Sequence, residues 1–135
     1  MSVIRDIRRA LAETLSNGGL NCEEYEEFTL PRTPCATLML ENARVTEWDQ
    51  QYGFGSIQFK LRNYHSFGGS ARTVDQNLDD DMTTILVLLG ADRTLNGRVI
   101  DVEITSVNRY YDSAPQPRYG WCEWILEVTP YANRG

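Results

Sequence analysis

His65 is the only histidine in the sequence, so any histidine-dependent catalytic arrangement of side chains would have to use it. A Ser-His-Asp or Cys-His arrangement needs a histidine to accept the proton of the nucleophile. His65 follows a segment that we predict to be a strand, where a polar residue needs no catalytic explanation. A single histidine also argues against a transition-metal site, because such sites usually combine several nitrogen or sulfur ligands. The sequence therefore predicts no catalytic centre, no metal and no cofactor.

The three cysteines, Cys22, Cys35 and Cys122, are odd in number and widely spaced. This spacing is typical of neither a disulfide framework nor a zinc motif. We expect all three to be reduced thiols, with the second and third of them on strands.

Two acidic clusters and two glycine-bearing stretches have residue types found in ion or phosphate sites. Residues 23–27 lack calcium-loop spacing, and consecutive side chains of 79–81 diverge by about 100° if the segment is helical. Neither 53–55 nor 68–69 completes a phosphate-binding fingerprint. We interpret the acidic clusters as solvated surfaces and the glycines as turns.

The aromatic residues indicate a different kind of site. Tyr, Trp and Arg are the residue types that anchor protein interfaces. Several of them cluster in residues 107–120, which we predict to be a protruding loop or hairpin arm. The alternative is that these rings fold back over the domain's own surface. The candidate subunit-interface residues are Trp48, Arg109, Tyr110, Tyr111, Pro115, Pro117, Arg118, Tyr119 and Trp121.

Two segments have the apolar spacing of helices. In residues 2–16, apolar residues recur every three or four positions, Ser2 can cap the start, and 17–19 end the helix. After 68–70, a second apolar stripe runs from Val74 to Leu89 with the same spacing, and Gly90 is expected to stop it.

Four segments alternate apolar and polar residues with the period of a strand: 36–41, 56–62, 100–105 and 122–128. We expect 20–34 to be irregular or to hold a short edge strand, and 42–53 to be a loop. The predicted fold is one α+β domain spanning 1–135. It has a single, mostly antiparallel sheet of about four strands with both helices on one face, in the order α-β-β-α-β-β.

Composition and charge exclude several classes of protein. The 135 residues fit one domain, and a formal net charge of −6 is the opposite of the basic surface that grips nucleic acid. No apolar run approaches the ~20 residues that cross a bilayer. We expect a soluble protein made in the cytoplasm, with no membrane partner.

The whole pattern resembles a known family. The features that carry this resemblance are the short helix 3–15, the Pro-bounded start of a strand at 30–34 and the aromatic strand 56–61. They continue with the helix 75–89 and the closing strand that begins at 119–121. Together they resemble the tail terminator proteins, also called tail-completion or minor tail proteins, of long-tailed bacteriophages.

The resemblance implies a structural role in the tail or neck of a virion. Such proteins are α+β subunits that form a hexameric ring on the tail tube, stop its polymerisation and meet the head-side connector. The implied partners are further copies of the chain, the tail tube protein and a connector or neck protein. DNA would pass through the channel without specific binding. The resemblance assigns no individual site residue.

Two other functions remain open at this stage. The first is another neck role, such as head completion or head-tail joining, which the sequence separates poorly from a terminator. The second is a small enzyme or ligand-binding domain that uses His65 with a carboxylate at a sheet edge.

Overall fold

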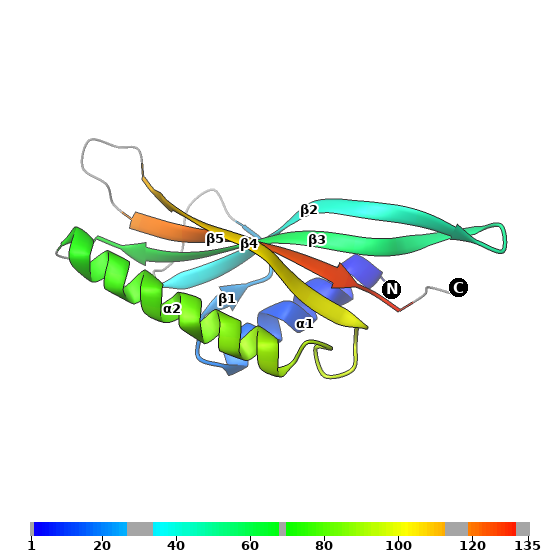
Figure 1. Ribbon diagram of the computed structural model, residues 1–135, viewed down its shortest axis with the longest axis horizontal. Helices are drawn as coiled ribbons and strands as arrows, with labels where there is room; N and C mark the ends of the chain where they lie inside the picture. The colour runs from blue at the N-terminus through cyan, green and yellow to red at the C-terminus, as the bar shows by residue number, and fades with distance from the viewer. Residues whose placement is uncertain (1, 27–33, 68–69, 113–118, 132–135) are drawn as a thin grey trace.

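Two helices pack on one face of a single sheet (Figure 1). The computed structural model describes residues 2–26, 34–67, 70–112 and 119–131. Within these residues the elements are, in chain order, α1 (Val3–Asn17), β1 (Cys22–Glu23), β2 (Cys35–Trp48), β3 (Gln51–Ser66), α2 (Ala71–Ala91), β4 (Asp101–Tyr111) and β5 (Tyr119–Thr129). The predicted α+β class with one sheet is confirmed.

The sheet has five strands among the described residues, in the order β1-β2-β3-β5-β4, so the prediction of four strands was wrong. The additional strand is β1, at the edge of the sheet, in the segment predicted to be irregular or to hold a short edge strand. It changes the order to α-β-β-β-α-β-β. It pairs in parallel with β2, through Cys22 with Ala36 and Glu23 with Thr37. The other neighbouring strands are antiparallel, as predicted for β2 and β3.

Both helices begin at a serine cap. The Ser2 hydroxyl accepts the backbone N–H of Arg5 at 3.2 Å, and the Ser70 hydroxyl accepts that of Thr73 at 3.2 Å. Each bond satisfies an amide that has no partner inside the helix. Gly90, the predicted stop of α2, lies inside the helix, which continues to Ala91.

The core fills the space between the helices and the sheet. The apolar stripe of α1 supplies Ile7, Leu11 and Leu15, and that of α2 supplies Val74, Leu78, Ile85 and Leu89. They meet alternate residues of the three inner strands, including the fully buried Phe59 and Trp124. No helix among the described residues is long and apolar enough to cross a membrane.

Residues 42–53 were predicted to be a loop, and this prediction was wrong. They form the end of β2 and the start of β3. Here β2 and β3 pair as a two-stranded ribbon that turns at Asp49 and Gln50, both with positive φ (45° and 66°). Two consecutive positive φ values suit the right-handed twist of a tight hairpin. Gly53 and Gly55, predicted to be in a turn, belong to β3.

Candidate interaction surface

The face of the sheet opposite the helices, here called the open face, carries polar and aromatic side chains. Because Phe59 and Leu61 face the core, the alternation of a strand places Lys60, Arg62 and Tyr64 on the open face. On β5 the corresponding residues are Tyr119, Trp121, Glu123, Ile125 and Glu127. The same strands thus build a core on one side and a candidate interaction surface on the other.

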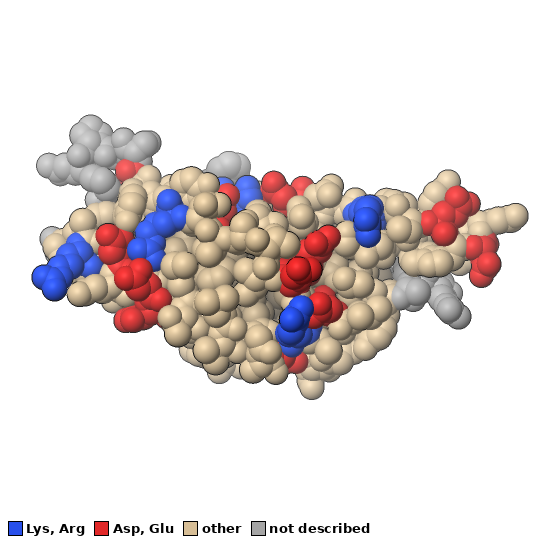
Figure 2. Space-filling view, in the orientation of Figure 1, with Lys and Arg blue, Asp and Glu red and all other residues tan. Residues whose placement is uncertain are grey.

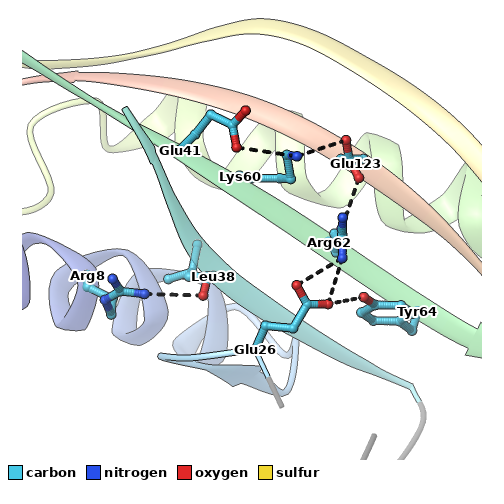
Figure 3. A network of polar contacts seen from close by, with 8 residues as sticks. All are labelled: Arg8, Glu26, Leu38, Glu41, Lys60, Arg62, Tyr64 and Glu123. Atoms are coloured by element: carbon cyan, nitrogen blue, oxygen red, sulfur yellow. Dashed lines mark hydrogen bonds and ion pairs between the residues drawn. The ribbon is translucent and has the colours of Figure 1, made fainter. Parts of the chain in front are cut away.

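An ion-pair network crosses this surface (Figure 3). The Arg62 guanidinium donates to both carboxylate oxygens of Glu26, at 3.0 and 2.9 Å, and to Glu123 at 2.9 Å. Lys60 lies 3.5 Å from the other oxygen of Glu123 and 3.3 Å from Glu41. Glu123 lies opposite Arg62 on the neighbouring strand β5, so one carboxylate pairs with both cations of β3.

Glu26, like Glu41, is a network residue that sequence reasoning missed. The Glu26 carboxylate accepts hydrogen bonds from the Tyr64 hydroxyl and from the Arg62 guanidinium. Glu26 itself lies just after β1, a strand of only two residues. Burial and then the hydrogen bond to Glu26 raise the pKa of Tyr64, so its hydroxyl stays protonated and remains a donor at neutral pH. The chain after β1 is thereby fastened to the open face of β3.

Four aromatic rings form a cluster beside this network. Trp121 lies at the centre, with ring centroids 5.9 Å from Tyr110, 5.7 Å from Tyr64 and 6.0 Å from Tyr119. The Tyr110 and Trp121 rings are stacked at 26°, and 43% of Tyr110 is exposed. The buried indole N–H of Trp121 has no hydrogen-bond partner among the described residues. Within the cluster, Tyr64 is therefore buried against the sheet, whereas the outer ring of Tyr110 is accessible to a partner.

The structure divides the predicted interface residues between different surfaces. Tyr110, Tyr119 and Trp121 meet in the aromatic cluster. Arg109 and Tyr111 point to the helix side instead, because successive residues of β4 alternate between faces. Pro115, Pro117 and Arg118 lie outside the described residues.

Arg109 and Tyr111 fasten α2 to the sheet. Arg109 donates to Asp79 at 2.8 Å and to Asp75 at 3.4 Å, and the Tyr111 hydroxyl donates to Asp75. Asp75 and Asp79 of α2 thus pair with side chains of the sheet.

Trp48 lies at the far end of the β2–β3 ribbon, away from the aromatic cluster. Its ring packs over Gly53, where an added Cβ would come within 2.2 Å of the ring. A side chain at position 53 would therefore collide with the Trp48 indole, so glycine is required there. The indole itself remains 39% exposed.

His65, the candidate for chemistry, joins a chain of polar contacts between β3 and α2. Its Nε2 atom lies 2.6 Å from Asp81, which also accepts the Asn63 amide at 3.4 Å. The Asn63 carbonyl in turn accepts the Trp124 indole N–H at 2.7 Å. These bonds satisfy polar groups at the edge of the core and hold α2 in place.

Cys122, the thiol on the strand beside Asn63, is fully buried. Burial raises its pKa, so the group stays a thiol at neutral pH, whereas a thiolate is the nucleophilic form. Among the residues that the structure describes, no three His, Cys, Asp or Glu side chains are grouped so that they could hold a metal ion.

The charge distribution shows no surface suited to gripping nucleic acid on the face drawn in Figure 2. Lys and Arg side chains there are interspersed with Asp and Glu rather than gathered in a stripe.

On the open face, Glu103 and Glu127 lie directly opposite each other on β4 and β5, and no described side chain forms a salt bridge with either. Like charges in this position destabilise a sheet, so a cation brought by a partner would relieve them.

Comparisons with known proteins assign no family. No protein-family model matches the sequence, and no curated protein matches it.

Proposed function

We propose that this protein is a structural subunit of a bacteriophage tail, a tail terminator that forms a ring on the tail tube. In this role it stops tube polymerisation and joins the tube to the head-side connector. The sequence resemblance described above motivates the proposal. It assigns no catalytic step to the chain.

The open face of the sheet is the observation that carries the proposal. Helices cover only one face, and on the other the aromatic cluster of Tyr110, Tyr119 and Trp121 stays partly exposed. Tyr and Trp supply large contact area with few rotatable bonds, which is why they anchor interfaces. A rigid sheet face of this kind suits a permanent contact with another subunit.

The charge of the chain fits a ring through which DNA passes. With a net charge of −6, the subunit repels phosphates at long range and would not hold DNA by counterion release.

Disrupting the gene in a phage that encodes the chain, followed by electron microscopy of the particles, tests the proposal. Loss of a terminator should give overlong tails or free tube polymers, and a wild-type copy supplied in trans should restore the normal length. A head-tail joining protein would instead leave normal tails beside unattached heads. That second phenotype, or particles indistinguishable from wild type, would contradict the terminator role.

A further inference from the structure

The chain crosses the outer edge of the sheet directly after β1. The ladder between β1 and β2 ends at Thr37, so the edge of β2 would lie bare from Leu38 onward. Residues 24–26, here called the clasp, come next in the chain. Arg8 of α1 holds them on the helix-covered face and Arg62 of β3 holds them on the open face (Figure 3). The clasp is therefore fastened from both faces of the sheet.

On the helix-covered face, Arg8 occupies a backbone acceptor that an added strand would use. Its guanidinium donates to the Leu38 carbonyl at 3.2 Å and to the Glu24 carbonyl at 3.0 Å. Arg8 is only 8% exposed, and its guanidinium lies 4.2 Å from the ring centroid of Tyr25 and 5.4 Å from that of Phe59. A buried cation is costly unless hydrogen bonds and ring faces compensate it. Arg8 therefore keeps the clasp against the edge of β2.

On the open face, Glu26 fixes the other end of the clasp. Its carboxylate accepts the Arg62 guanidinium at 3.0 and 2.9 Å and also accepts the Tyr64 hydroxyl. Only 15% of the Glu26 side chain is exposed. A guanidinium that binds both oxygens of a carboxylate forms a strong, geometrically specific pair. Lifting the clasp would break this pair and the Arg8 contacts together.

The clasp covers the regular part of this edge. Further along β2, Glu41 is an extra residue between Leu40 and Asn42 and interrupts the row of backbone groups. At the opposite edge of the sheet, β4 has the extra residue Thr105, whose hydroxyl donates to the Ile125 carbonyl at 3.1 Å. Covered edges and bulges are two ways in which proteins prevent pairing of sheets edge to edge. The clasp and the two bulges thus have one effect in common.

We infer that the clasp is an edge guard, which keeps a strand of a second copy from adding to β2. The unpaired N–H and C=O groups of a bare strand are a template for pairing with another chain. A second copy is the occupant, because every molecule with an open clasp carries the same bare edge. The guard leaves the open face as the surface where copies meet. The inference does not depend on a role in the phage tail.

One variant on each face opens the clasp. Glu26→Gln keeps the size of the side chain but removes its charge, whereas Arg8→Lys keeps the charge but loses the planar group that reaches two carbonyls. Glu24→Gln and Arg9→Lys are the matched controls. They alter only an exposed ion pair beside the clasp, 3.8 Å long, and leave the Glu24 carbonyl in place.

Hydrogen exchange of the Ala36 amide reports whether the edge is covered. This N–H donates to the Asn21 carbonyl at 2.7 Å, at the start of the guarded stretch. It should exchange at least about tenfold faster in both clasp variants and at the wild-type rate in both controls. Amides of α2 and β5, read in the same experiment, should keep their protection because the fold persists without the clasp.

Association is the second readout, measured by analytical ultracentrifugation. The clasp variants should form heavier species than the wild-type chain at the same concentration, and protection of the Ala36 amide should return as concentration rises. The inference is overturned if the Ala36 amide exchanges as in the wild-type chain, or if faster exchange brings no added association. It is also overturned if protection falls equally in α2 and β5, since the contacts would then serve the whole fold. The tail role is judged separately, by tail length.

Discussion

On the helix-covered face of the sheet, Phe59, Leu61 and Trp124 are fully buried, whereas the next residues along the same strands, Lys60 and Glu123, belong to a half-buried ion-pair network. The first face is stabilised by removal of apolar area from water, which is not directional. The second is stabilised by paired charges and stacked rings, which require particular geometry. The comparison shows which face folds the chain and which is available to neighbours, and each prediction below tests that division.

The largest expected effect is on the helix-covered face. Trp124→Ala removes the largest fully buried side chain and the donor to Asn63, so the free energy of unfolding should fall by about 3–5 kcal/mol. Urea denaturation measures it. Ile125→Ala, one residue along the strand on the open face, is the control and should cost far less. Equal losses at both positions would contradict the division between the faces.

A smaller effect is expected in the ion-pair network. Arg62→Ala leaves the half-buried carboxylates of Glu26 and Glu123 without their common partner, which should cost about 1–3 kcal/mol of unfolding free energy. Arg93→Ala breaks a pair of exposed side chains, Arg93 and Asp101, and should change stability little. Urea denaturation measures both losses. Equal shifts of the urea midpoint in the two variants would contradict a stabilising role for the network.

Alkaline pH should weaken the helix-covered face through Cys22. Burial, and then nearby charges led by Glu23, raise the pKa of its thiol from 9.0 to about 12. Above pH 9 the unfolded chain releases this proton while the folded chain retains it, so stability falls as pH rises toward 12. Cys22→Ala should reduce that fall by about 1.4 kcal/mol per pH unit. Denaturation curves at pH 8 and pH 10 measure the difference; parallel behaviour of both proteins would show that the thiol is not desolvated.

The helices were predictable because their signals are local. The apolar spacing of residues 2–16 and the hydroxyl of Ser2 are properties of one short segment, and the structure has α1 at Val3–Asn17 with that cap. Gly90 misled the prediction of where α2 ends, because Leu89 is buried in the core and packing outweighs the low helix propensity of glycine.

The β2–β3 ribbon was missed because its signals resemble those of a loop. Gly53 and Gly55 are usual in turns, and the hairpin turn at Asp49 and Gln50 lacks the glycine typical of its type. The glycines instead leave room for Trp48 and Thr46 across the ribbon. Such a requirement comes from the partner strand and is not visible in either segment alone.

The candidate site was predictable only in part, for the same reason. The aromatic composition of 107–120 pointed to Tyr110 and Tyr119, but alternation along β4 turns Arg109 and Tyr111 toward α2. Glu26 gave no local signal, since its role depends on Arg62 and Tyr64 far along the chain.

The most direct test of the open face as an assembly surface is Tyr110→Ala, measured for both assembly and folding. The ring is 43% exposed and stacks on Trp121, so its loss should lower the free energy of unfolding by only about 0.5–1.5 kcal/mol. The dissociation constant of the assembled protein should rise at least about tenfold. Assembly at wild-type affinity, or a collapse of stability in the isolated chain, would show that the aromatic cluster serves the fold and not its neighbours.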